Sequence, residues 1–151
     1  MVPVLAILFI GCGENYQGTY TGTGKVVANG CNAVANNPYN MEVQASVSSG
    51  SMELVVTKFT EAANNQSDSA YSLIAGPKID ATINGNTSFS DVNQSYLNTS
   101  TNTTDTVSAS GNINADRSVI SAFNFTRTTT LQGSTTACTF SVIADTLTKA
   151  Q

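Results

Sequence analysis

The sequence contains no histidine and no tryptophan, and it has few charged side chains. Histidine is the commonest general base and metal ligand in proteins, so its absence excludes Ser-His-Asp triads. Because the chain also has no Cys-x-x-Cys pair, we expect no zinc site. Only 11% of the residues are charged, against about 25% in an average soluble domain. The six Lys and Arg residues form no cluster. We therefore expect no metal, no cofactor and no nucleic-acid partner.

Ten carboxylates remain as candidates for chemistry. Glu42, Glu53 and Glu61 occupy alternating or loop positions that are typical of solvated side chains, and no pair stands out as a glycosidase-type acid couple. The segment 112–116 offers oxygen ligands for a calcium ion, but its composition is that of an ordinary turn. The sequence predicts no catalytic residue and a protein that is not an enzyme.

Asn, Ser, Thr and Gly take the place of the missing charge. These residues suit turns and the solvated faces of strands, and they compete with helical hydrogen bonding. With 151 residues, 40% of them hydrophobic, the chain is long enough and apolar enough for one folded domain. Because aromatic residues are only 7% of the chain, we expect a core of Val, Ile, Leu and Phe.

The first ten residues, MVPVLAILFI, form an uninterrupted apolar run that Gly11-Cys12-Gly13 ends. As a helix this run would span about 15 Å, half of a bilayer core, so it is too short to cross a membrane. Its length matches the hydrophobic region of a signal peptide. The stretch Phe9-Ile10-Gly11-Cys12 resembles the lipobox of bacterial lipoproteins, in which a small residue precedes a cysteine.

This resemblance implies a diacylglyceryl group on the thiol of Cys12 and cleavage of the leader before it. Residues 1–11 are then a lipoprotein signal peptide, 12–15 a lipidated tether and 16–151 an all-β domain. Phe9 stands where the family favours Leu, and no Lys or Arg precedes the apolar run. Gly13 replaces the Asp that retains members in the inner membrane, which favours an outer-membrane anchor with the domain periplasmic or surface-exposed. The alternatives are an ordinary cleaved secretion signal and a buried N-terminal strand.

Cys31 and Cys138 are the two remaining cysteines. Export would place them in an oxidising compartment, where two leftover cysteines most often pair. The sequence thus predicts a Cys31–Cys138 disulfide, and the alternative is two independent buried thiols.

Short runs with a period of two indicate strands. The clearest hairpin joins Met41–Val47, in which apolar and polar residues alternate, to Met52–Phe59 across Ser48-Ser49-Gly50. A second hairpin turn is expected at Asn84-Gly85. The other expected strands are 16–28, 71–75, 79–83, 87–92, 107–113, 119–131 and 137–147, the last two carrying Phe123, Phe125, Phe140 and Val142 as core. The segments 29–38, 61–69 and 97–105 are expected to be loops.

Eight or nine such strands, joined mostly by tight turns, predict one antiparallel meander. An up-and-down barrel is favoured over a β-sandwich, because the first and last strands of an even-numbered barrel are antiparallel neighbours. Cys31, after the first strand, would then lie beside Cys138 at the start of the last. The segments Gly18–Gly22 and Val107–Phe125 loosely resemble the hairpins of lipocalin-like barrels.

Two functions remain open for a membrane-anchored, non-enzymatic envelope protein. The first is the binding of a small apolar ligand inside the barrel, which small residues at candidate inward positions suggest: Gly22, Gly24, Ala28, Ala109 and Gly111. The second is a structural or interaction role, in which polar loops near Asn64 and Thr101 meet another envelope component. A barrel filled by its own side chains would favour the second.

Overall fold

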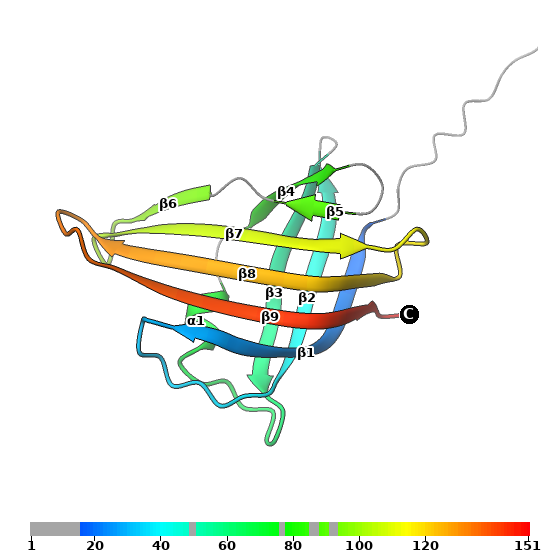
Figure 1. The fold of residues 1–151 in the computed structure, drawn as a ribbon, viewed down its shortest axis with the longest axis horizontal. Helices are drawn as coiled ribbons and strands as arrows, with labels where there is room; N and C mark the ends of the chain where they lie inside the picture. The colour runs from blue at the N-terminus through cyan, green and yellow to red at the C-terminus, as the bar shows by residue number, and fades with distance from the viewer. Residues whose placement is uncertain (1–15, 49–50, 76–77, 85–87, 91–93) are drawn as a thin grey trace, which may run out of the picture.

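The computed structural model describes residues 16–48, 51–75, 78–84, 88–90 and 94–151. They form an antiparallel all-β domain in which eight strands close a barrel and one further strand extends an edge (Figure 1). The predicted fold, a meander closed as a barrel, is confirmed. Within these ranges no helix has both the length and the apolar character needed to cross a bilayer.

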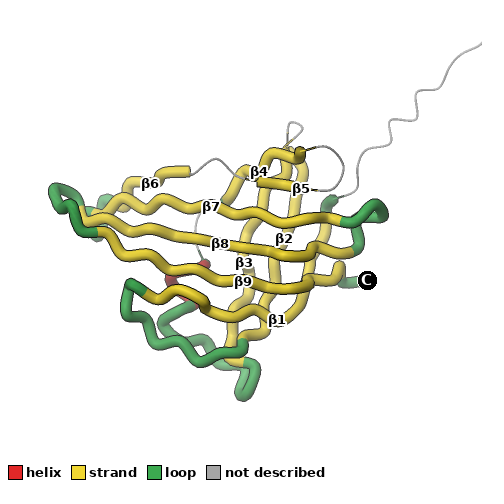
Figure 2. Tube along the Cα trace, in the orientation of Figure 1, coloured by secondary structure: helices red, strands yellow, loops and turns green. Residues whose placement is uncertain are grey.

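The strands follow one another around the barrel in chain order. The first five are β1 (Gly18–Asn29), β2 (Tyr39–Ser48), β3 (Ser51–Glu61), β4 (Ile79–Asn84) and β5 (Ser88–Ser90). The remaining strands are β6 (Gln94–Asn98), β7 (Thr103–Ile113), β8 (Val119–Leu131) and β9 (Ala137–Lys149). β5 pairs with β7, and β9 returns to β1 to close the barrel, while β6 pairs only with the first half of β7. Figure 2 shows β7, β8 and β9 running side by side, with β2 and β3 crossing behind them.

A disulfide links the two ends of the meander. Cys31, two residues beyond β1, is bonded to Cys138 near the start of β9, with 4.8 Å between the Cα atoms. The Gly30 N–H donates to the Thr139 carbonyl nearby at 2.8 Å, which continues the β1–β9 pairing to the crosslink. The predicted pairing of these cysteines is confirmed.

The core consists of the inward side chains of alternating positions. In β2, Met41, Val43 and Ala45 are buried, as their alternation predicts. The four predicted core positions of β8 and β9 are also buried: Phe123, Phe125, Phe140 and Val142. Burial of these side chains stabilises the barrel by about 25 cal/mol for each Å² of apolar surface removed from water.

The prediction of a strand over Tyr71–Ala75 is wrong. Tyr71–Ile74 forms one helical turn, α1, which the Ala75 N–H closes by donating to the Tyr71 carbonyl at 2.8 Å. The turn buries Ile74 and the preceding Ala70. The pairing of β3 with β4 covers only Met52–Leu54 of β3, and α1 packs against β3 and β8. A single helical turn forms its backbone hydrogen bond internally, so it can bury Ile74 and Ala70 without pairing to a neighbouring strand.

The prediction of an exposed loop over Leu97–Asp105 is also wrong. β6 continues to Asn98 and β7 begins at Thr103, so only a tight turn separates them. Asp105 lies inside β7 and is buried. Residues 1–15, which include Cys12, lie outside the described residues, as do the turn positions 49–50, 76–77 and 85–87 and the strand prediction at 91–92.

Candidate functional site

The interior of the barrel was the first candidate for a binding site, and its own side chains fill it. Large side chains from all around the sheet are at most 2% exposed: Tyr16, Tyr20, Tyr39, Met41, Met52, Leu54, Phe59, Phe89, Phe123, Phe125 and Phe140. The rings of Tyr39 and Phe59 stack with 4.0 Å between their centroids. The interior is thus built as a packed core.

The small residues make room for these large side chains. A Cβ on Gly24 would lie 3.1 Å from the Met41 sulfur and 3.4 Å from the Phe59 ring. A Cβ on Gly111 would lie only 2.7 Å from Cζ of Phe89. Of the five small residues predicted to face inward, Gly24, Ala109 and Gly111 are buried, and two are only half-buried: Gly22 and Ala28.

Gly111→Ala should lower the free energy of unfolding by about 1–3 kcal/mol, because the added methyl group overlaps the Phe89 ring. Chemical denaturation of the variant measures the loss. In Gly111→Ala/Phe89→Leu, the smaller side chain removes the overlap, so the double variant should be more stable than the two single losses added together. Strictly additive losses would contradict this packing account.

A groove on the outside of the barrel, between β1 and β9, is the second candidate. Its volume is about 470 Å³. Gly22 and Gly24 are among its lining residues, and the register between the two strands shifts between them. A Cβ on Gly22 would come within 2.3 Å of the Thr146 carbonyl, so the two strands approach closely there. The other lining residues are Thr21, Thr23, Lys25, Pro38, Ile143, Asp145, Thr146 and Thr148.

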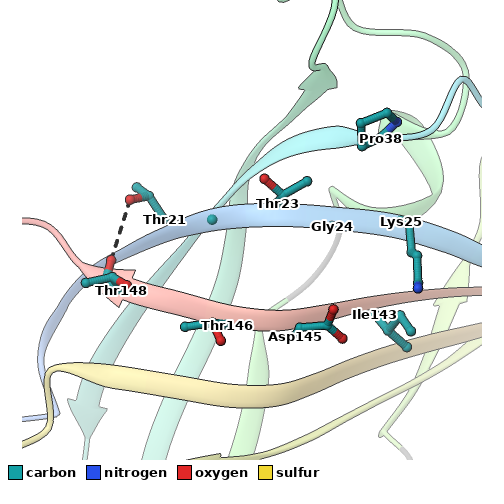
Figure 3. Close-up of a pocket in the computed structure, with 10 residues that line it drawn as sticks. Thr21, Thr23, Gly24, Lys25, Pro38, Ile143, Asp145, Thr146 and Thr148 are labelled. Atoms are coloured by element: carbon teal, nitrogen blue, oxygen red, sulfur yellow. Dashed lines mark hydrogen bonds between the residues drawn. The ribbon is translucent and has the colours of Figure 1, made fainter.

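Figure 3 shows that threonine side chains line much of this groove, together with Pro38 and Ile143. Lys25 from β1 and Asp145 from β9 are exposed on its two sides. The Thr21 hydroxyl donates to the Thr148 carbonyl at 3.5 Å, across the two strands. None of the polar side chains that line the groove is buried, so it provides a shallow contact surface of mixed apolar and polar character.

The third candidate is a polar cleft between α1 and β6, with a volume of about 450 Å³. Its floor is the ion pair between Arg127 and Asp105, with 2.7 Å between Nη2 and Oδ2. The Thr129 hydroxyl also donates to Asp105, at 2.6 Å. Burial alone would raise the pKa of the Asp105 carboxyl group. The hydrogen bonds from Arg127 and Thr129 and the positive charge of Arg127 together lower it by more, so the net pKa lies below its usual value.

Arg127 also holds α1 in place. Its Nη1 donates to the carbonyls of Ser72 and Leu73, at 3.0 and 3.3 Å. The guanidinium group thus joins β7, β8 and α1 at the end of the barrel. Because its charge is already paired with Asp105, this cleft is a structural clasp and has no free cation for an anionic ligand.

A second buried polar contact orders the loop before α1. The Tyr39 hydroxyl donates to Asp68 and accepts the Asn36 N–H at 2.5 Å. Burial, together with the hydrogen bond to Asp68, raises the pKa of Tyr39 above the ordinary range of a tyrosine. The phenol therefore stays neutral and acts as a fixed link between β2 and the loop.

No protein-family model, curated protein or solved structure matched this chain. Its function must therefore be argued from its own residues.

The metal and catalytic predictions can be placed in the structure. Within the described ranges, no group of three or more potential ligand side chains comes together. In the 112–116 segment, the Asp116 carboxylate accepts the Ser118 hydroxyl at 2.7 Å, and the Asn114 amide oxygen accepts the N–H groups of Ser118 and Val119. These contacts are ordinary turn chemistry. Glu42, Glu53 and Glu61 lie at the barrel surface, on different strands or at different ends.

Proposed function

We propose that this protein is a non-enzymatic, lipid-anchored component of a bacterial cell envelope, whose barrel serves as a rigid interaction module. The observation that carries the proposal is a packed interior in a domain stapled by a disulfide. A disulfide persists in oxidising compartments, which agrees with the export signal expected from residues 1–11. The lipobox-like sequence before Cys12 supplies the anchor.

The packed interior favours an interaction role over the binding of a small apolar ligand. Lipocalin-like barrels, which this meander resembles in topology, hold ligands in a cavity at the barrel mouth. Here Met41, Phe59 and Phe89 occupy the space that small residues leave. A ligand would have to displace buried aromatic rings, each of which contributes several kcal/mol to stability. The outer surface and the loops are therefore the parts of the domain available to a partner.

The short tether, residues 12–15, would decide which end of the barrel faces the membrane. Tyr16 is already buried: it accepts a hydrogen bond from the Tyr20 hydroxyl at 3.0 Å, and the Arg117 guanidinium lies 4.5 Å above its ring. Four residue steps separate Cys12 from Tyr16, a reach of at most about 14 Å. The end with the β7–β8 turn and the C-terminus would thus lie near the lipid surface (Figure 1).

A palmitate analogue fed to the host should label the wild-type protein and leave Cys12→Ser unlabelled. Two or three acyl chains at about 0.8 kcal/mol per methylene should also keep the wild type in the membrane fraction. The matched control is Cys31→Ser/Cys138→Ser, which keeps Cys12 and should be labelled as strongly as the wild type. Equal labelling of Cys12→Ser would end the lipoprotein proposal.

A further inference from the structure

The ladder of strands ends at β6. This strand lies along the first half of β7, and within the described ranges no other strand pairs with it (Figure 1). Its register with β7 runs without a shift from Gln94 to Asn98. A strand has two edges that can form a ladder, and β6 uses one of them for β7. We call its other edge the open edge.

The alternation of hydrogen bonds shows which backbone groups of β6 point to the open edge. In an antiparallel sheet, successive residues of a strand bond alternately to the strands on either side. The Gln132 N–H donates to the Asn102 carbonyl at 2.9 Å, one step beyond the first pair of the β7–β8 ladder. Even-numbered residues at this end of β7 therefore bond to β8, and odd-numbered ones bond to β6. The partners of the odd-numbered residues are Gln94, Tyr96 and Asn98. The N–H and C=O groups of Ser95 and Leu97 thus point to the open edge.

These outward groups are unpaired and accessible. In the part of the chain that the structure describes, no hydrogen bond engages the backbone of Ser95 or Leu97 on this side. Both residues are exposed, and the Leu97 side chain is 59% exposed. The Ser95 hydroxyl is directed along the sheet to Thr106, 3.2 Å away, so it does not cover the edge. Exposed N–H and C=O groups on a strand edge are a template for a further strand.

The sequence of β6 lacks the features that keep edge strands from pairing. Natural edges are protected by lysine or other charges, by proline or by a β-bulge. Gln94–Asn98 contains no charged residue, no proline and no register shift. It instead places the apolar side chain of Leu97 beside the unpaired backbone groups. This combination is expected of an edge that is kept for a partner.

The polar cleft between α1 and β6 provides the room that a further strand needs. Tyr96 and Leu97 line it on the β6 side, and Ser72 and Ala75 line it on the α1 side. A strand added to β6 would lie about 4.8 Å from it, and so within this cleft. The Asp105–Arg127 ion pair on the cleft floor is neutral overall. A side chain that points into the cleft should therefore be uncharged, because a charge there would lose water without gaining a partner.

The open edge selects an extended peptide chain, and the tether selects a chain from another protein. Alternating N–H and C=O groups are matched by a second backbone, as in other cases of strand addition. Two identical edges related by a twofold axis pair antiparallel, so two copies joined through β6 would point their barrels in opposite directions. The proposed lipid tether would instead hold the same end of every copy at the membrane. A second copy is therefore a poor occupant of this edge.

We propose that β6 binds an extended segment of another envelope protein by β-strand addition. In the antiparallel arrangement, the partner residues opposite Ser95 and Leu97 exchange both backbone hydrogen bonds with them. The residue opposite Leu97 lies on the same outer face and is apolar, and the residue opposite Tyr96 points into the cleft and is uncharged. This inference deepens the proposed function by naming the kind of partner, and it rests on that function for the exclusion of a second copy.

The test uses the full chain with Cys12→Ser, its disulfide intact, and a phage-displayed library of random linear peptides as the probe. Selected peptides, synthesised singly, should shift the amide NMR signals of Ser95 and Leu97 the most. Methylation of the peptide nitrogens that face β6 should weaken binding by about tenfold or more, since it removes donors and keeps the side chains. The lipid is not needed, so failure of acyl labelling and failure of peptide binding are separate results.

Leu97→Pro tests the edge from the side of the protein. Proline removes the N–H that points to the open edge, so binding of the same peptides should weaken by about tenfold or more. The lost N–H plays no part in the pairing with β7, and circular dichroism and the melting temperature should stay close to those of the parent. Leu97→Thr is the matched control: it keeps the N–H and loses only the apolar contact, so it should weaken binding less.

Three results would overturn the proposal. A folded parent protein that selects no peptide above background would do so directly. Peptides that bind equally well after methylation, or that bind Leu97→Pro as tightly as the parent, would show that another surface holds them. Dimerisation of the parent that Leu97→Pro abolishes would assign the open edge to a second copy of this chain.

Discussion

Replacing Cys31 and Cys138 with serine should lower the free energy of unfolding by about 4–5 kcal/mol, the largest loss we expect from any change outside the core. The crosslink joins residues 107 positions apart in the chain. In the chain-entropy account, closing a loop of ~100 residues restricts the unfolded ensemble by about 4.7 kcal/mol. For a chain of this length the loss corresponds to a fall in melting temperature of roughly 10–20 °C.

The folded state should change little in this variant. β1 and β9 remain paired along most of their length, and Phe140 and Val142 stay in the core. Denaturant unfolding should therefore show a lower midpoint and a larger dependence on denaturant, since the unfolded chain becomes more extended. Wild-type protein treated with a reductant should reproduce both effects, and Cys12→Ser should show neither. A double variant whose free energy of unfolding stays within about 1 kcal/mol of the wild-type value would contradict this prediction. It would mean that residual structure already restricts the unfolded chain without the crosslink.

The sequence predicted the barrel because apolar alternation and turn residues repeat along most of the chain. In Met41–Val47 the period of two is complete, and β2 follows it. The disulfide prediction depended on the expected export and on the two cysteines left after Cys12, and the positions of Cys31 and Cys138 in turn favoured a closed barrel, in which the first and last strands are neighbours. Alternation and turn residues are local patterns, so the strands could be predicted from the sequence alone.

The errors arose where polar residues form strands. Leu97–Asp105 is a polar, low-complexity run, which predicts a loop, yet threonine is also a good strand residue when one face is solvated. Here Thr104 and Thr106 lie on the solvated face of β7, and Asp105 between them is buried. α1 was missed because a single helical turn is too short to show a period of 3.6 residues.

The alternation of residues in β7 and β8 already indicates the buried ion pair between Asp105 and Arg127. Counting back two residues from the inward-facing Val107 reaches Asp105, and counting forward two from Phe125 reaches Arg127. Both charges therefore had to point toward the inside of the barrel, and Val107 and Arg127 are cross-strand partners. The polar composition of Leu97–Asp105 predicts a loop, whereas the alternation of residues in β7 correctly places Asp105 on the inward face.

Asp105→Ala should cost about 3–5 kcal/mol of stability at neutral pH, because it leaves the Arg127 charge unpaired in a site where its side chain is only 15% exposed. The change also removes the acceptor of the Thr129 hydroxyl and loosens the clasp on α1. Denaturant unfolding measures the loss. Asp105→Leu/Arg127→Met removes both charges and should recover most of the lost stability, since an apolar pair avoids the desolvation penalty.

The contribution of Asp105 should also depend on pH in a defined direction. The pKa of its carboxyl group is lower in the folded protein than the ordinary value of 3.8 that applies when the chain is unfolded. The stabilisation is therefore complete above about pH 5 and is lost as the pH falls through the folded pKa. The stability difference between the wild type and Asp105→Asn should shrink over this acid range. The surface pair Glu53–Lys78, in which Lys78 is exposed and Glu53 half-buried, provides the control. Glu53→Gln should leave the unfolding midpoint almost unchanged at neutral pH. A difference between wild type and Asp105→Asn that stayed constant down to about pH 2 would show that the buried carboxylate does not need its charge to hold the end of the barrel closed.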